Sequence, residues 1–414
     1  MAATRPLAIV LGGTQAHVVL VEQLKARGYY VLLADYLESP PAAGVADEHS
    51  RVSTLEREHV VVLAAERNAA LVIATSVDRA NVTAAYVAER LSLPAPYTFA
   101  TASIIADKLA MKQRLASAGV PTAPFVALRS VTDGNARSLP FPVVVKPTDT
   151  GGSKAVRKVS NPDELQRALE QAFEVTRAPQ VLVEAFIEGI EVAADCVVRE
   201  GRPHVLLLRR KYVMSGRDGE VLANYASVCP AVLSRNAESR IHDAILQIVR
   251  AFGLQTTPLL VQFIVDGDDV QVIELAPRVG GGTNYQQVLL RTGVDIVASA
   301  IDSYLGASAP IVVRQTPGFS ASAHLYASAG RFGEVRHVEA LIEKRVVDAF
   351  YTHKARGARI GASMSSSDRV ASFIVSGDSG EALLHKIRDA VERLDVVDAE
   401  GTSILRRDVY LKAL

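Results

Sequence analysis

The chain has 414 residues, which at roughly 150 residues per domain suggests two to four domains. Its 45 Lys and Arg residues balance its 45 Asp and Glu residues, so the formal net charge is zero, which argues against a general nucleic-acid or membrane-surface binder. Hydrophobic residues make up 49% and aromatic residues 6%, so we expect a globular protein whose core is built from Ala, Val, Leu and Ile.

The two cysteines, Cys196 and Cys229, lie in apolar, strand-like stretches without a CxxC or histidine partner. We interpret them as inert core thiols, which suits a reducing compartment. The apolar run near the N-terminus ends in glycines and indicates a first strand, not a signal peptide. No stretch approaches the roughly 18 apolar residues of a membrane-spanning helix. These features predict a cytoplasmic protein.

The first 100 residues or so alternate between apolar runs and helical spacing. Leu7–Leu11 breaks at a glycine pair, a helix is expected over 15–27, and Tyr30–Ala34 ends at Asp35. A helix near 55–67, a strand at Leu71–Thr75 and a helix over 79–91 follow. This alternation predicts a parallel sheet.

The pattern changes after residue 100. The spacing predicts one helix over 103–118, and Asn161 is a suitable N-cap for a helix over 162–176. Leu259–Val265 and Val270–Leu275 flank Asp266-Gly267-Asp268-Asp269, which predicts a hairpin. The other expected strands are Val143–Lys146, Val181–Phe186, Val192–Arg199 and Val205–Arg210, and the other helices are Glu238–Phe252, 293–305 and 380–393.

Gly12 and Gly13 follow the first strand and would let a ligand approach a helix N-terminus. Asp35 lies at the distance of the ribose-binding acid in dinucleotide-binding proteins, but the third glycine of that motif is missing. A tight turn and a loop that touches a small substrate both remain open here.

Two further segments carry candidate nucleotide-binding residues. Lys146 at a strand end, followed by Gly151, Gly152 and Ser153, can hold phosphates by charge and by backbone N–H groups. The strand leading to Glu184, with Glu191 seven residues later, can recognise an adenine edge and a ribose. An ordinary polar hairpin and a solvated acidic turn are the alternative interpretations.

The hairpin supplies the fourth candidate. Gln262 and Glu274 lie on its two strands and can face the same way. A carboxylate within an apolar strand requires a cation, and Mg²⁺ with phosphate oxygens suits it. Arg278, shortly after, can clamp a phosphate with two hydrogen bonds, although a Glu–Arg ion pair is the alternative.

The order and spacing of these features resemble the ATP-grasp superfamily of ligases. The segment DKLAMKQRLASAGVPTAPF from Asp107 is similar to the one that opens the ATP-grasp domain, and residues 11–50 are similar to the family's N-terminal domain. The resemblance is strongest to carbamoyl-phosphate synthase-like, purine-biosynthetic and amino-acid ligases. It implies an α/β fold with an N-terminal parallel-sheet, Rossmann-like domain, an ATP-grasp fold of two α+β subdomains, and a C-terminal portion. The expected segments are 1–102, 103–188, 189–308 and 309–414.

The resemblance also implies an activity. A carboxylate–amine ligase of this family activates a small-molecule carboxylate as an acyl phosphate and joins it to an amine, with release of ADP and phosphate. ATP and Mg²⁺ are the implied cofactors, Mn²⁺ being an alternative metal, and homodimers are common in the family. The implied ATP contacts are Lys108, Lys146, Gly151, Gly152, Ser153, Glu184, the backbone of Ile187, and Glu191; Gln262 and Glu274 ligate the metal; Arg278 and Lys211 face the reacting groups.

Two positions depart from the family pattern. Gln262 stands where many relatives have an acid, and Ala276 stands where many have an asparagine. Asn284, a few residues later, could take the role of that missing asparagine. These departures keep open a non-catalytic ATP-binding protein. A biotin-carboxylase-like or carbamate-forming enzyme is a further alternative. Biotin carboxylases have a run with glutamate and arginine where this chain has the sequence SASAHLY at 320–326, which contains His324. We expect substrate specificity in the loops at 76–79, 211–224 and 280–287.

Overall fold

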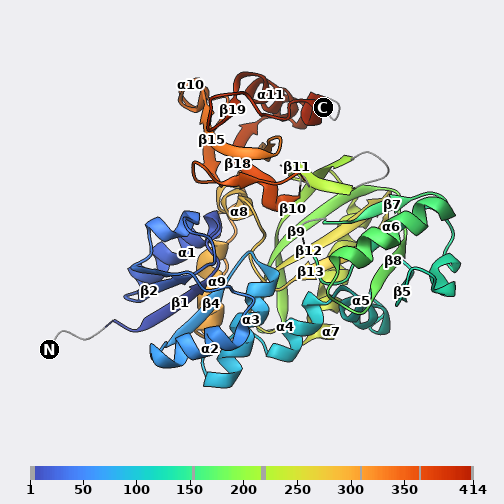
Figure 1. The fold of residues 1–414 in the computed structure, drawn as a ribbon, viewed down its shortest axis with the longest axis horizontal. Coiled ribbons are helices and arrows are strands. Elements are labelled where there is room, and N and C mark those ends of the chain that lie inside the picture. The colour runs from blue at the N-terminus through green and yellow to red at the C-terminus, as the bar shows by residue number, and fades with distance from the viewer. Residues whose placement is uncertain (1–4, 152–153, 216–220, 308–309, 363–364, 412–414) are drawn as a thin grey trace.

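The computed structural model describes residues 5–151, 154–215, 221–307, 310–362 and 365–411, without the side chains of residues 136–137, 215, 221–223 and 367. An N-terminal α/β layer lies beside a central body of antiparallel strands, and the C-terminal elements cover one end of that body (Figure 1). None of the helices in the described part of the chain is long and apolar enough to cross a lipid bilayer.

The N-terminal layer is a four-stranded sheet of order β3-β2-β1-β4, and its pairs are all parallel. The parallel sheet predicted from the alternating pattern is therefore confirmed. The strands β1 and β4 are buried along their whole length because helices cover both faces of the sheet. Its elements are β1 (Leu7–Leu11), α1 (Gln15–Ala26), β2 (Tyr30–Ala34), η1 (Pro41–Gly44), β3 (Glu48–Ser50), α2 (Arg57–Glu66), β4 (Leu71–Ala74) and α3 (Asp78–Leu91).

A second four-stranded sheet, of order β5-β8-β6-β7, is antiparallel. The single helix predicted over 103–118 is wrong. The chain breaks at Asp107, whose extended backbone ends α4 and whose carboxylate caps α5 by accepting from the Ala110 N–H. The elements are α4 (Phe99–Ala106), α5 (Lys108–Ser117), β5 (Phe125–Leu128), η2 (Gly134–Arg137), β6 (Val143–Pro147), β7 (Arg157–Val159), α6 (Pro162–Val175) and β8 (Val181–Ala185).

The central sheet has eight strands in the order β13-β12-β9-β10-β11-β14-β18-β16. Helix α7 buries Ile241, Ile245 and Ile248 against it, at the spacing of one helix face. The elements are β9 (Ile190–Arg199), β10 (Arg202–Ser215), β11 (Val221–Cys229), α7 (Arg235–Phe252), β12 (Thr257–Asp266), β13 (Asp269–Ala276), α8 (Asn284–Thr292), α9 (Ile296–Tyr304), β14 (Phe319–Tyr326), β16 (Ala349–Thr352) and β18 (Arg369–Gly377).

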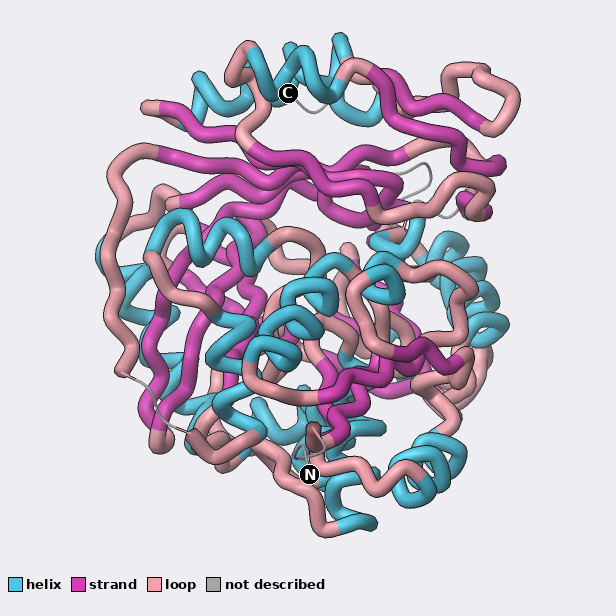
Figure 2. The backbone as a smooth tube through the Cα atoms, turned by 90° about the vertical axis from the view of Figure 1, so that its left-hand side faces the viewer, coloured by secondary structure: helices cyan, strands magenta, loops and turns pink. Residues whose placement is uncertain are grey.

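The C-terminal elements extend this sheet and cover it, as Figure 2 shows at the top of the view. Alternate residues of β14 separate two environments: Ala321, Ala323 and Leu325 join the apolar core under α11, whereas Ser322 and His324 lie on the opposite, polar face. The remaining elements are β15 (Gly330–Arg336), α10 (Val338–Glu343), β17 (Arg359–Ile360), η4 (Ser366–Asp368), α11 (Gly380–Arg393), β19 (Asp395–Asp398) and α12 (Asp408–Leu411).

Candidate functional site

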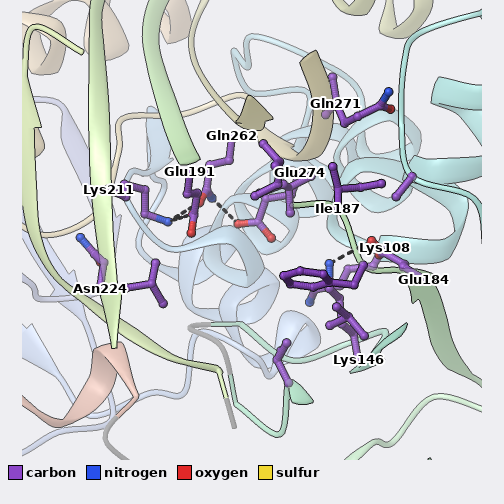
Figure 3. A pocket seen from close by; sticks show the side chains of 18 of the residues that line it. Lys108, Lys146, Glu184, Ile187, Glu191, Lys211, Asn224, Gln262, Gln271 and Glu274 are labelled. Atoms are coloured by element: carbon purple, nitrogen blue, oxygen red, sulfur yellow. Dashed lines mark hydrogen bonds and ion pairs between the residues drawn. The ribbon is translucent and has the colours of Figure 1, made fainter. Parts of the chain in front are cut away.

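A cavity of about 280 Å³ lies between the second sheet and the β9–β13 side of the central sheet. It brings together most of the residues singled out from the sequence: Lys108, Lys146, Gly151, Glu184, Ile187, Glu191, Lys211, Gln262 and Glu274. Figure 3 labels all of these residues except Gly151 and shows their side chains around one space. Gly152 and Ser153 lie outside the described residues. Arg278 is not among the residues that line the cavity.

One end of the cavity, which we call the lysine end, contains Lys108, Lys146 and Glu184. The Lys146 ammonium donates to Glu184 Oε2 over 3.0 Å, and the Lys112 ammonium lies 3.2 Å from the same oxygen. Burial alone would raise the pKa of Glu184, but the two ammonium groups outweigh it and hold the pKa below its usual range. Glu184 therefore stays ionised as the shared counterion of two lysines.

Lys112 was missed in the sequence, although it lies four residues after Lys108 and so on the same face of α5. Its side chain is buried, and it also donates to Thr122 Oγ1 over 2.7 Å. Burial lowers the pKa of Lys112, and Glu184 only partly offsets this effect. The i, i+4 lysine spacing was the available signal, but only the structure shows that Lys112 points inward.

Lys108 begins α5, and its ammonium donates to the carbonyl oxygen of Thr150, in the loop that contains Gly151. The Lys108 N–H also donates to the Thr148 carbonyl over 3.3 Å. The start of α5 is thus tied to this loop by two contacts from one residue. An anion that competes for the Lys108 ammonium would also change the contact with the loop.

The middle of the cavity holds a chain of four polar side chains, drawn with dashed lines in Figure 3. The Lys211 ammonium donates to Glu191 and, over 2.6 Å, to Gln262 Oε1. The Gln262 amide in turn donates to Glu274 Oε1 over 2.5 Å. Gln262 and Glu274 are direct cross-strand partners, which confirms the prediction that they share a face. We call Gln262 and Glu274 the Glu274 pair.

The Glu274 pair provides one carboxylate and one neutral amide oxygen. Within the described residues, no group of three or more His, Cys, Asp and Glu side chains could hold a metal ion. Mg²⁺ usually keeps several waters and binds one or two carboxylates together with substrate phosphates. The pair fits such a magnesium site, provided that Gln262 Oε1 exchanges its Lys211 contact for the metal.

Arg278 lies beside this centre but points to the N-terminal layer. Its guanidinium binds both carboxylate oxygens of Asp78, at 2.7 and 2.8 Å. Burial would lower the pKa of Arg278, but Asp78 and, more weakly, Glu274 outweigh it and raise the pKa. Asp78 opens α3, so this pair joins the N-terminal layer to the hairpin that carries Glu274. The Glu–Arg ion pair considered from the sequence is therefore not formed among the described residues; the partner of Arg278 is Asp78.

Asn284 does not take the place of the missing asparagine. Its Oδ1 accepts a hydrogen bond of 3.0 Å from Arg209, which also binds Asp195 over 2.6 Å. Arg209 and Asp195 are both buried, and Asn284 does not line the cavity. The second Arg209 amino group, Nη2, is buried without a partner among the described residues.

The opposite end of the cavity, which we call the arginine end, contains Asn224, Ser366 and Arg369. Arg369 Nε donates to the Tyr326 hydroxyl over 2.8 Å, and its Nη2 donates to Asn224 Oδ1 over 2.5 Å. These residues come from β11, β14 and the C-terminal strand β18. No sequence motif connects them, so this end of the cavity was not predicted, apart from the expectation that residues 211–224 contribute to specificity.

The structure also shows the surroundings of the cysteines, His324, Gly13 and Ser76, which were considered from the sequence. Cys196 and Cys229 are buried and free, which confirms them as core thiols. His324 is buried, with Nδ1 2.7 Å from Ser372 Oγ, as expected for a core histidine. Gly13 lies where a Cβ atom would meet Pro40 at 2.4 Å, so packing of a tight turn explains this glycine. Ser76 donates to the Gly280 carbonyl over 3.4 Å, so two of the expected specificity loops meet.

Comparison with known sequences identifies two regions. Residues 139–286 match the sequence model of the ATP-grasp domain, and residues 323–399 match that of the L-amino acid ligase C-terminal domain 2. A D-alanine–D-alanine ligase from Trichlorobacter lovleyi is 30% identical over 189 residues, which are 44% of this chain and 58% of the ligase. The mitochondrial carbamoyl-phosphate synthase of Rattus norvegicus is 30% identical over 194 residues, 46% of this chain and 12% of the synthase.

The fold has counterparts along nearly the whole chain. The crystal structure of L-amino acid ligase from Bacillus licheniformis superposes with a TM-score of 0.80 at 21% identity, and the match covers 95% of this chain and 99% of that one. With the domain matches, this likeness confirms the predicted fold class. The chain therefore contains an ATP-grasp domain over residues 139–286. It spans only part of the ligase and synthase sequences that it matches.

Proposed function

We propose that the protein is an ATP-dependent carboxylate–amine ligase. The observation that carries this proposal is the single cavity that gathers Lys108 and Lys146 at one end and the Glu274 pair at its middle. A polyphosphate needs cations along its length, and a phosphoryl transfer needs the transferred group held beside a metal-binding carboxylate. The ATP-grasp match and the ligase relatives support the same activity.

In this proposal the lysine end holds the nucleotide. Lys108 and Lys146 contact the phosphates, Gly151, Gly152 and Ser153 form the loop over them, and Glu191 takes the ribose. Glu184 orients Lys146, because their contact is 3.0 Å long and Glu184 is buried. Adenine is recognised beside Glu184 through the backbone of Ile187, which lines the cavity.

The Glu274 pair is the proposed metal site. Mg²⁺, or Mn²⁺ in its place, would be held by Glu274 and Gln262 and would offset charge on the phosphates. Lys211 then releases Gln262 Oε1 and turns its ammonium toward the transferred group. Arg278 contributes a second positive charge from beside the pair, where Asp78 fixes its direction.

The proposed reaction joins a carboxylate to an amine in two steps. The substrate carboxylate attacks the γ-phosphate, which gives an acyl phosphate and ADP; the amine then attacks the acyl carbon, which gives an amide and phosphate. Lys211 and Arg278 stabilise the charge that develops during both steps. A closed cavity protects the acyl phosphate from water, and Gly151, Gly152 and Ser153 are proposed as the flap that excludes it.

Further parts of the proposal concern the molecule as a whole. The segments 1–102, 103–188, 189–308 and 309–414 are proposed as its N-terminal, lid, nucleotide- and metal-binding, and C-terminal parts. A cytoplasmic location is supported by the two buried free cysteines. A homodimer is proposed from the family alone. The match to an L-amino acid ligase C-terminal domain favours amide formation over the biotin-carboxylase-like alternative.

The test is carboxylate-dependent ADP release by the purified chain, over a wide panel of carboxylates and amines, with mass detection of the products. Glu274→Ala and Arg278→Ala should each abolish the release, whereas Arg388→Gln, on the exposed side of α11, should not. Near-normal turnover in either site variant would refute the site assignment. ATP binding without ADP release across the whole panel would instead indicate the non-catalytic alternative.

A further inference from the structure

The arginine end of the cavity carries a guanidinium, that of Arg369, which forms no ion pair with any of the described residues. Among the described residues, Arg369 contacts no carboxylate: its partners are the Tyr326 hydroxyl and the side-chain and backbone oxygens of Asn224. The other two cations near the cavity centre are neutralised, since Lys211 pairs with Glu191 and Arg278 with Asp78.

The guanidinium of Arg369 is held with one edge free. Of its five N–H donors, those of Nε and Nη2 face Tyr326 and Asn224, whereas Nη1 donates to none of the described residues. Nη1 lies 3.4 Å from the position that a Cβ atom of Gly282 would occupy. This edge therefore lies beside Gly282, and Arg369 is among the residues that line the cavity.

The neighbours of Arg369 fix its position. Tyr326 is fully buried, and its hydroxyl both accepts from Arg369 Nε and donates to the Asn224 carbonyl over 3.1 Å. Asn224 is held in turn by a 3.0 Å hydrogen bond from Nδ2 to Ser227. A guanidinium ordered before binding loses little side-chain entropy when an anion arrives.

The histidines nearby respond to the same charge. Burial lowers the pKa of His353 to about 3, and Arg369 is the next largest cause. His324 also has its pKa lowered by burial and then by Arg369. Both rings are neutral at pH 7, so they add no competing positive charge, and Arg369 remains the cation that an anion would meet.

We infer that the arginine end binds a second anionic group, a carboxylate, on the substrate, so that the enzyme prefers acidic substrates over neutral ones of the same shape. Arg369 Nη1 and the Ser366 hydroxyl would donate to this group. The inference rests on the proposed function and adds a substrate class to it. It also gives the C-terminal part a role in specificity, because η4 and β18 supply Ser366 and Arg369 to a cavity whose other lining residues all precede residue 275.

The experiment uses pairs of compounds that differ only in charge at the remote group: aspartate and asparagine, glutamate and glutamine, succinate and succinamate. Their binding to the full chain is measured by calorimetry with a non-hydrolysable ATP analogue present. In parallel, ADP release is measured with hydroxylamine as the acceptor. A charge-assisted hydrogen bond contributes about 1.5–3 kcal/mol, so we expect a roughly 10- to 100-fold preference for the acid of at least one pair.

Arg369→Gln should reduce this preference to about onefold, and Arg369→Lys, which keeps the charge but not the fork, should leave an intermediate value. Arg388→Gln is the matched control and should keep the wild-type preference, since Arg388 is exposed on α11. The affinity for the ATP analogue shows whether each variant is folded. It should be equal in the wild type, Arg369→Gln, Arg369→Lys and Arg388→Gln.

Two results would overturn the inference: equal binding of acid and amide by the wild type, or a preference that persists in Arg369→Gln. If Arg369→Gln fails to bind the ATP analogue, the test uses Arg369→Lys instead. A wild-type preference for the acid over the amide in Arg369→Lys would then refute the role of the Arg369 guanidinium. Acid-selective binding without ADP release for any carboxylate would refute the proposed ligase activity and leave the anion site standing.

Discussion

Replacing Glu184 by glutamine tests the charge arrangement at the lysine end. The carboxylate is 4% exposed, and its Oε2 lies 3.0 Å from the Lys146 ammonium and 3.2 Å from that of Lys112. Glu184→Gln would leave both ammonium groups without their counterion. Lys112, with a side chain that is 1% exposed, could not turn to water.

The magnitude follows from that burial. At about 3 Å and an effective dielectric constant of about 20, each pair attracts by about 5 kcal/mol, and desolvation of the charges cancels much of it. Removing one partner of a buried ion pair typically costs about 3–5 kcal/mol of unfolding free energy. We therefore expect Glu184→Gln to lose about 3–5 kcal/mol.

A double-mutant cycle separates the ion pair from the loss of shape. Lys112→Met in the Glu184→Gln background removes the stranded charge, so it should restore about 0.5–3 kcal/mol of unfolding free energy, the range of coupling for residues in contact. Unfolding in urea is followed by circular dichroism and tyrosine fluorescence, since the chain has no tryptophan. Asp269→Asn is the control, because its ion pair with Arg240 is largely exposed.

The reasoning would be refuted if Glu184→Gln were as stable as the wild type, or if the Lys112→Met change were equally costly in both backgrounds. The first result would mean that solvent reaches the lysine end and screens the charges. The second would mean that Lys112 contributes by packing alone.

Three further predictions concern the remaining polar contacts. Gln262→Glu places a second carboxylate about 2.5 Å from its partner Glu274, so the variant should be less stable without metal and should bind Mg²⁺ more tightly. A calorimetric titration that finds the wild-type Mg²⁺ affinity would contradict this prediction. Asp78→Asn removes the partner that directs Arg278, so carboxylate-dependent turnover should fall while ATP affinity stays unchanged; unaltered turnover would argue against a directing role. The pKa of His353 is lowered to about 3, so between pH 6.5 and 3 the unfolded chain binds a proton that the folded chain does not, and stability is lost as the pH falls through this window. His353→Gln should reduce the slope of unfolding free energy against pH there by up to about 1.4 kcal/mol per pH unit, and an unchanged slope would contradict the assignment.

The sequence was sufficient where chemistry depends on neighbours along the chain. The turn at Asp266–Asp269 sets the register of the hairpin, so the pairing of Gln262 with Glu274 follows from local spacing. The strand–helix alternation of the first 91 residues likewise predicts a parallel sheet, because consecutive units of this kind connect in one hand. Local signals failed at Asp107, where a side-chain cap divides one apparent helix into two.

Only the tertiary structure decided which charges meet. Lys112 contacts Glu184, Arg278 contacts Asp78, and Arg369 contacts Asn224, across separations of 72, 200 and 145 residues. No periodicity along the chain reports such pairs, because they depend on how separate sheets and helices pack. The sequence thus determined the fold and the hairpin that pairs Gln262 with Glu274. Packing decided which lysine is buried, where Arg278 points, and that Arg369, which forms no ion pair among the described residues, lies at the far end of the cavity.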